Sequence, residues 1–137
     1  MESEIHISLC RILKADMEKC IPESLLVLWE TGTIAFREFP ATTEISGFRP
    51  DLKVYSDSKA FCALGDAKTA NDIKNKHTKA QLFAFLGFGQ KYKFFALFYR
   101  VPANCYHHFA HFIKSSSLPD SFRGKLFINN IPFIFDL

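Results

Sequence analysis

The sequence "GFRPDLKVYSDSKAFCALGDAKTANDI", residues 47–73, carries three charged side chains at the ends of two apolar, strand-like segments. Asp51 opens the first segment, PDLKVYS, and Asp66 and Lys68 close the second, AFCALGDAK. The intervening residues DSK are turn-like. This arrangement predicts two strands joined as a β-hairpin.

The period of a β-strand brings these charges together. Asp66 and Lys68 are two residues apart and therefore project to the same side of their strand. If the turn centres between Asp57 and Lys59, Asp51 lies opposite residue 64, 65 or 66. Two carboxylates and one ammonium group are thus expected to meet at one edge of a sheet.

Adjacent carboxylates repel each other, and one of them takes up a proton unless a cation lies between them. A magnesium ion resolves this conflict because it prefers a few carboxylate or carbonyl oxygens. We therefore expect Asp51, Asp66 and the backbone carbonyl of Ala67 to bind Mg²⁺, with Mn²⁺ as a substitute. Lys68 would then lie beside the attacking water or a phosphate oxygen. The alternative is that Asp51 only begins a strand while Asp66 and Lys68 form an exposed pair at a strand end.

Pro50-Asp51 followed by Asp66-Ala67-Lys68 resembles the signature of the PD-(D/E)xK nuclease superfamily, the restriction-endonuclease-like proteins. The resemblance covers roughly residues 1–100. It implies metal-dependent hydrolysis of phosphodiester bonds in DNA, with Asp51 and Asp66 as metal ligands and Lys68 assisting the attacking water. It also implies a core ordered helix, three strands, helix, strand. Asp66 stands where glutamate is commoner in the family.

Two further residues are implied by the same resemblance. Some members carry a glutamine on the helix that follows the lysine strand, and Gln81 occupies such a place. Many members carry a glutamate on the first helix that faces the metal, for which Glu4 is the best match and Glu2 a second choice. Without the resemblance, Gln81 and Glu4 read as surface residues of helices.

The rest of the chain reads as alternating helices and strands. Residues 3–20 have apolar side chains at helical spacing, with Ser3 as N-cap. Residues 22–30 suit a short helix, or a strand through LLVLW, and 31–40 read as a strand. Residues 69–89 predict a helix with a Thr69–Asp72 capping pattern. A strand, a helix and a terminal strand pair around Asn129-Asn130 follow, over 91–101, 102–116 and 124–137.

These elements predict an α/β fold, with a mixed α+β sheet flanked by helices in a single domain over residues 1–137. The predicted order is the αβββαβ restriction-endonuclease-like core plus a C-terminal helix and strand pair. Twelve of the 16 phenylalanines follow residue 80, which indicates an aromatic core or a subunit interface. A homodimer or a partner protein subunit is therefore an open possibility.

Charge is distributed unevenly along the chain. Residues 1–48 hold eight acids and four bases, a net of −4, whereas residues 49–137 hold six acids and 13 bases, a net of +7. Lys74, Lys76 and Lys79 on the predicted 69–89 helix are candidates for contact with DNA phosphates. Otherwise they form a solvated lysine-rich surface.

A rival metal motif lies at residues 105–111, CYHHFAH, where two histidines stand one helical turn apart. That spacing can bind zinc. The motif holds a single cysteine and no second ligand cluster is near in sequence, so an aromatic helix carrying histidines is favoured. Its potential ligands are Cys105, His107, His108 and His111.

The sequence also bears on location. The four cysteines form no C-x-x-C pair, the N-terminal residues show no signal-peptide pattern, and no apolar run approaches the ~20 residues that span a bilayer. We expect a cytoplasmic protein with reduced thiols and no membrane partner. The predicted function is a Mg²⁺-dependent deoxyribonuclease, of the endonuclease type. The alternative is a catalytically inactive nuclease-fold module that binds nucleic acid or a partner protein.

Overall fold

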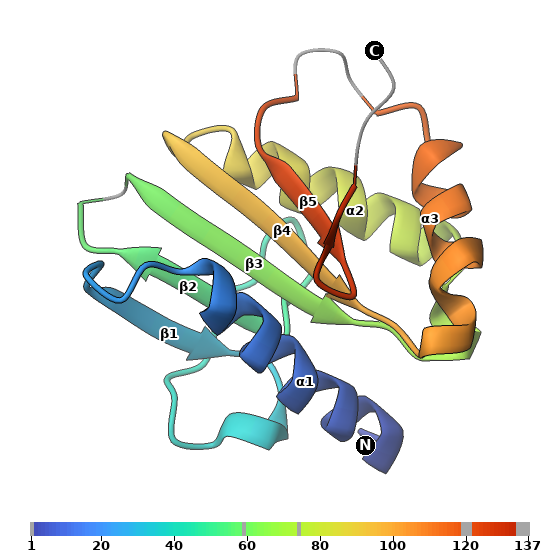
Figure 1. The fold of residues 1–137 in the computed structure, drawn as a ribbon, viewed down its shortest axis with the longest axis horizontal. Helices are drawn as coiled ribbons and strands as arrows, with labels where there is room; N and C mark the ends of the chain where they lie inside the picture. Colours follow the sequence, from blue (N-terminus) through green and yellow to red (C-terminus); the bar gives the residue numbers. More distant parts are fainter. Residues whose placement is uncertain (1, 59, 74, 119–121, 134–137) are drawn as a thin grey trace.

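The computed structural model describes residues 2–58, 60–73, 75–118 and 122–133 (Figure 1). The order of helices and strands agrees with the prediction for a mixed α/β fold. The elements are α1 (Glu4–Cys20), β1 (Val27–Thr31), β2 (Leu52–Ser56), β3 (Phe61–Ala67), α2 (Lys76–Gly89), β4 (Phe94–Arg100), α3 (Tyr106–Lys114), β5 (Lys125–Ile128) and β6 (Ile131–Pro132). Short 3₁₀ helices cover Ile34–Phe36, Ala70–Asp72 and Ala103–Cys105.

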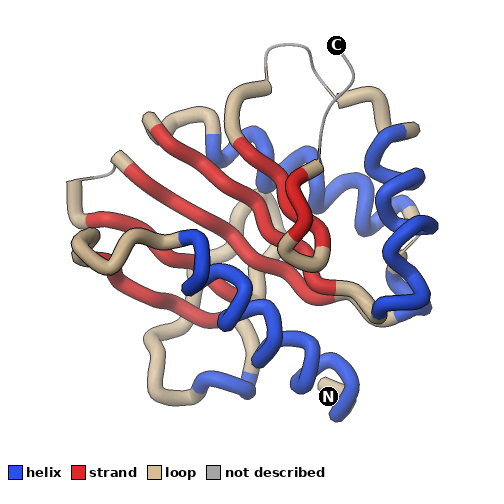
Figure 2. The backbone as a smooth tube through the Cα atoms, viewed as in Figure 1, coloured by secondary structure: helices blue, strands red, loops and turns tan. Residues whose placement is uncertain are grey.

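All the described strands belong to one mixed sheet with the order β1-β2-β3-β4-β5-β6 (Figure 2). The first three strands pair antiparallel, β3, β4 and β5 pair parallel, and β6 returns antiparallel to β5. Parallel neighbours require crossover connections, and α2 and α3 provide them. The predicted hairpin of β2 and β3 is therefore present, at the centre of the sequence and beside the parallel half of the sheet.

Helices cover both faces of the sheet: α1 lies on one face, and α2 and α3 lie on the other (Figure 1). On the first face, Leu13 and Met17 of α1 pack in a core with Val54 and Phe98. The second face holds a larger core that includes Leu64, Leu82, Phe85, Tyr99 and Phe109. Because both faces are covered, nearly every residue of β3 is buried. None of the helices in these described ranges is long and apolar enough to cross a bilayer.

Helix α1 is capped at its first turn and is joined to the sheet by an ion pair. The Ser3 side chain accepts a hydrogen bond from the His6 backbone N–H, as predicted for the N-cap. Near the other end of the helix, buried Asp16 accepts two hydrogen bonds from the Arg100 guanidinium of β4, at 2.9 and 3.0 Å. Such bidentate pairs add geometric specificity. They therefore help to set the orientation of α1 across the strands.

The region between α1 and β2 differs from the prediction. The strand alternative for 22–30 holds, because β1 covers Val27–Thr31, and the short helix predicted there is wrong. The strand predicted over 31–40 is also wrong, since Ile34–Phe36 form a 3₁₀ helix. The chain turns sharply at Gly32, where an added Cβ would lie 2.3 Å from the Pro50 carbonyl oxygen. The Thr33 side chain then caps the 3₁₀ helix by accepting from the Ala35 N–H.

The start of α2 differs as well. Helix α2 begins at Lys76, where the Asn75 side chain accepts from the Thr78 N–H at 2.7 Å. The predicted capping pattern at Thr69 is wrong: its hydroxyl donates to the Asp72 carboxylate within a separate 3₁₀ helix. By contrast, the predicted terminal hairpin is present. Asn129 and Asn130 both have positive φ, 51° and 63°, as the tight turn between β5 and β6 requires.

We expect Gly65→Ala to lower the free energy of unfolding by about 1–3 kcal/mol. The added Cβ would lie 2.6 Å from Met17 Sδ and 3.1 Å from Leu13 Cδ2, so it would force α1 away from β3. Urea unfolding of the purified chain measures the change. Gly87→Ala on α2 is the matched control, since nothing lies within 4 Å of its added Cβ and alanine favours the helix by about 0.5–1 kcal/mol. Equal effects at the two positions would contradict the close contact between α1 and β3.

Candidate metal and active site

The β2–β3 register brings Asp51 and Asp66 together. Leu52 pairs with Gly65, so extending the register by one residue puts Asp51 opposite Asp66, within the predicted range. The Asp51 backbone N–H donates to Asp66 Oδ1 at 3.3 Å, and the Ala67 N–H donates to Asp51 Oδ2 at 2.8 Å. The two carboxylates therefore meet at the C-terminal end of β3, the central buried strand.

Lys68 joins this pair. Its Nζ lies 2.8 Å from Asp66 Oδ2, and its backbone N–H donates to the Arg100 carbonyl. Asp66 and Lys68 are only 3% and 6% exposed, and Asp51 is 7% exposed. The alternative interpretation of an exposed pair at a strand end is therefore wrong, because these charges lie inside the molecule. Burial of ionised groups is costly unless they are paired or bind an ion.

The close approach of two buried carboxylates is electrostatically unfavourable when both are ionised. Burial, together with the negative charge of Asp51, raises the pKa of Asp66 to about 8, although Lys68 opposes the shift. The ionised form of Asp66 is therefore disfavoured near neutral pH in the metal-free protein. A bound cation would reverse this preference.

His6 of α1 is a member of the cluster that sequence reasoning missed. Its Nε2 lies 3.1 Å from Asp51 Oδ2, and this hydrogen bond raises the pKa of His6 to about 9 despite partial burial. The signal was present in the helical period: His6 shares a face with Cys10, Leu13 and Met17, all of which point to the sheet. A polar residue on an otherwise apolar, buried helix face indicates a polar partner on the sheet, which here is Asp51.

Of the glutamates proposed for the first helix, Glu2 reaches the cluster through His6, with its Oε1 3.7 Å from His6 Nδ1. Glu4 is exposed, and no contact between it and Asp51 or Asp66 occurs among the described residues. Glu2 accepts hydrogen bonds from the Thr33 hydroxyl and the Ile34 N–H. Helix α1 therefore offers His6, rather than a glutamate, to the two aspartates.

Cys10 lies beside His6 one helical turn further along. One ligand atom from each of His6, Cys10 and Asp51 lies within 4.8 Å of the other two. Burial raises the pKa of the Cys10 thiol strongly, which keeps it protonated. Metal binds the thiolate and the neutral imidazole, whereas the raised pKa values keep both Cys10 and His6 protonated near neutral pH, so the carboxylates are the better ligands here.

Two polar atoms on the opposite face of the sheet from α1 have no partner among the described residues: Gln81 Oε1 and the Tyr99 hydroxyl. Gln81 lies on the buried face of α2, and Tyr99 pairs with Asp66 in the β3–β4 register. Burial, and then the charge of Asp66, raise the pKa of Tyr99. Buried polar groups without partners are rare and point to a water, an ion or a ligand. Tyr99 was missed because its strand reads as continuous core.

The remaining predicted residues lie outside this cluster. Lys76 and Lys79 are exposed on α2, and Lys74 falls outside the described residues. In the rival zinc motif, Cys105 is buried whereas His107, His108 and His111 are exposed on α3. Within the described part of the chain, these four do not form a group of three ligand atoms close enough for one ion.

The fold and the site together define a mixed α/β domain with a buried aspartate–lysine cluster at the end of its central strand. A scan against protein-family models, a search of curated proteins and a search of solved structures each found no match to this chain. The functional assignment therefore depends on the geometry of the cluster.

We expect the metal-free protein to lose stability as the pH rises from 6.5 to 9. The folded-state pKa of His6, about 9, exceeds its ordinary value of 6.5, so the His6–Asp51 pair stabilises the fold fully below pH 6.5 and is lost towards pH 9. Asp66 acts in the same direction, because its folded-state pKa of about 8 lies above the ordinary 3.8. His6→Gln should reduce the loss in free energy of unfolding between pH 6.5 and 9 by about 1 kcal/mol. This expected value is small because the His6–Asp51 pair is partly exposed.

Urea unfolding in EDTA at several pH values measures this dependence. His108→Gln, an exposed histidine of α3, is the matched control and should leave the curve unchanged. A curve that keeps its parental slope in His6→Gln would show that the imidazole does not couple to Asp51.

Proposed function

We propose that this chain is a divalent-metal-dependent deoxyribonuclease of the endonuclease type, similar to the PD-(D/E)xK nucleases. One observation carries the proposal: the paired carboxylates of Asp51 and Asp66, with the Lys68 ammonium 2.8 Å from Asp66, are buried on two paired strands. The order α1-β1-β2-β3-α2-β4 supports it, because the motif and the core order implied by the resemblance occur together.

The residues at the site fit a divalent ion. Asp51, Asp66 and the Ala67 carbonyl would hold Mg²⁺ or Mn²⁺, and His6 is in reach of the Asp51 carboxylate. The raised pKa of Asp66 and the unpartnered Tyr99 hydroxyl both favour an added cation with its water. Such an ion would lower the pKa of the attacking water and neutralise charge on the phosphate.

The protein's own residues would position the reactants. The Lys68 ammonium, held by Asp66, can donate to a phosphate oxygen or orient the water. His6 fixes the Asp51 carboxylate from the side of α1. The Gln81 amide and the Tyr99 hydroxyl retain free hydrogen-bonding capacity for water or substrate.

The DNA backbone would lie along α2. Lys76 and Lys79 are exposed there and would contact phosphates without reading base sequence. Lys74 belongs to the same proposed contact. Cutting both strands of a duplex with one site per chain would call for a homodimer or a partner subunit.

One observation favours the alternative of an inactive module that binds nucleic acid or a partner protein. Asp51 accepts a hydrogen bond from the Ala67 N–H and pairs with His6, and Asp66 pairs with Lys68. Such internal pairs could hold the strands together without chemistry. Metal binding and DNA cleavage, measured separately, distinguish the two functions.

We expect Mg²⁺ or Mn²⁺ to raise the melting temperature of the parent protein by several degrees, because an ion that binds only the folded state stabilises it by mass action. At 100 times the dissociation constant the gain is about 2.7 kcal/mol. Asp51→Asn should abolish the shift. Asp57→Asn, in the exposed β2–β3 turn, should retain it. A shift of equal size in both variants would place the ion elsewhere.

We expect the purified chain to nick supercoiled plasmid in Mg²⁺ and to stop in EDTA. Asp66→Asn and Lys68→Ala should each lower the rate at least a hundredfold, since each removes a group placed at the reacting phosphate. The conversion of supercoiled to open-circular DNA on gels measures the rate. Lys19→Ala, an exposed lysine at the end of α1, is the control and should cut like the parent.

Binding of metal without cleavage of duplex, single-stranded or branched DNA would support the inactive module. A Lys68→Ala variant that cuts at the parental rate would remove the proposed role of Lys68 even in an active nuclease.

A further inference from the structure

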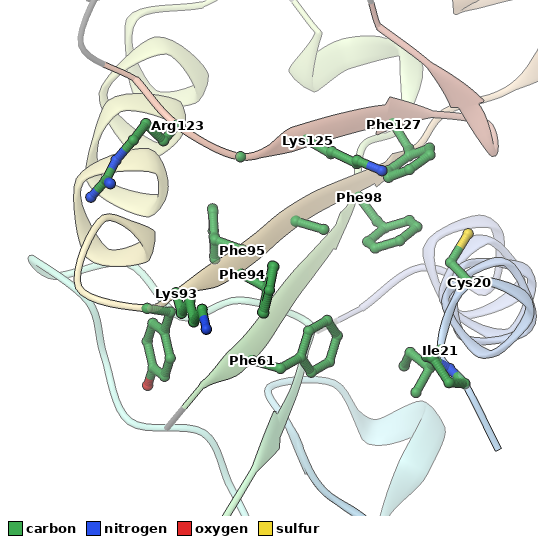
Figure 3. A pocket seen from close by; sticks show the side chains of 14 residues that line it. Cys20, Ile21, Phe61, Lys93, Phe94, Phe95, Phe98, Arg123, Lys125 and Phe127 are labelled. Atoms are coloured by element: carbon green, nitrogen blue, oxygen red, sulfur yellow. The ribbon is translucent and has the colours of Figure 1, made fainter. Parts of the chain in front are cut away.

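A second site lies on the α1 face of the sheet, beyond the C-terminal end of α1. It is a pocket of about 750 Å³ between the starts of β3, β4 and β5 and the segment after α1 (Figure 3). Five phenylalanines from three strands line it, namely Phe61, Phe94, Phe95, Phe98 and Phe127. Its size is that of a typical ligand pocket.

The rings form an ordered aromatic surface. Phe98, which is only 2% exposed, lies at the base of the pocket, and the half-buried Phe127 stacks on it with the ring centroids 4.6 Å apart and an interplanar angle of 9°. Phe94, the first residue of β4, is 60% exposed at the pocket. A large aromatic group left in water beside further rings points to a binding surface.

The charged side chains that line this pocket are all basic. Lys93 precedes β4, Arg123 lies just before β5, and Lys125 begins β5, and all three are exposed. The described residues that line the pocket include no acid. Lys93 already lies 5.5 Å from the centre of the Phe94 ring, so a cation and an aromatic group are presented together.

We propose that this pocket binds single-stranded DNA, whose bases stack on the exposed Phe94 ring and the half-buried Phe61 and Phe127 rings while its phosphates contact Lys93, Arg123 and Lys125. Proteins that bind single-stranded nucleic acid combine aromatic rings with cationic side chains. Every base has a face for stacking, and every phosphate linkage carries a negative charge. The choice of DNA rests on the proposed nuclease function, whereas the binding surface does not depend on cleavage.

Two other occupants fit less well. A second copy of the chain, docked by two-fold symmetry, would bring the same three cations against each other. An acyl anion would satisfy one cation with its single carboxylate and leave the other two unused. A chain of phosphates matches cations that are spread along the pocket.

The site is separate from the aspartate cluster. Phe61 and Asp66 lie near opposite ends of β3, about 17 Å apart at the rise of a strand. Phe61, Phe98 and Phe127 belong to the core that packs with α1. Leu64, on the same side of β3 as Asp66, belongs to the core that packs with α2 and α3. The pocket would therefore hold a strand away from the point of cleavage.

Fluorescence anisotropy of a labelled 15-nucleotide oligo-dT, with the full chain in EDTA, tests this site. We expect binding that weakens with salt, with a slope of about −2 in log K against log salt for three phosphate contacts. Phe94→Ala should weaken binding by about five- to hundredfold. Lys125→Glu should weaken binding and reduce the slope by about 0.7 or more. Circular dichroism confirms that the variants are folded.

The matched controls are Ile34→Ala, an exposed apolar residue, and Arg11→Glu, an exposed base of α1; both should bind like the parent. Because binding is measured in EDTA, where no cleavage is expected, a failure of binding is separable from a failure of cleavage. The proposed site is overturned if oligo-dT does not bind, or if Phe94→Ala and Lys125→Glu bind normally. Three further results would each reassign it: preference for oligo-rU, binding of laurate alone, or a dimer that Phe94→Ala dissociates.

Discussion

The placement of two carboxylates side by side at the end of a buried strand is the constraint on which the rest of the site depends. Asp51 and Asp66 meet because β2 and β3 pair antiparallel in a single register. A slip of one residue would turn Asp66 and Lys68 to the other face. The backbone N–H groups of Asp51 and Ala67 each donate to the opposite carboxylate, so the hairpin and the charge cluster stabilise one geometry.

Helix α1 contributes both packing and chemistry to that geometry. Leu13 and Met17 pack over Gly65, which leaves no room for a side chain beside Asp66. One helical face then carries His6 to Asp51 at 3.1 Å. The Asp16–Arg100 pair fixes the same helix to β4. A shift of α1 would therefore change the core and the electrostatics of the site together, which couples stability to the arrangement of the charges.

Local patterns were enough to predict the cluster on the strands but not its tertiary partners. Strand parity placed Asp66 and Lys68 on one side, and the turn at residues 57–59 limited Asp51 to three possible partners. His6 and Tyr99 reach the site from elements distant in sequence, so no local pattern fixed their approach. The strand expected over 31–40 failed for a similar reason: the chain bends at Gly32, which lies against the Pro50 carbonyl oxygen, and the local apolar alternation does not reveal this tertiary contact.

A purely structural role explains this cluster less well than it explains Asp16–Arg100. The Asp16–Arg100 pair joins one acid to one base in a bidentate geometry and leaves neither carboxylate oxygen without a donor. The Asp51–Asp66 cluster buries two acids, and the pKa of Asp66 rises although Lys68 is 2.8 Å away. Apolar residues of similar volume often stabilise a fold as well as or better than a buried ion pair. The divalent ion that we propose would favour the ionised form of both carboxylates, so a metal site would account for two buried acids on the central strand that a structural ion pair does not.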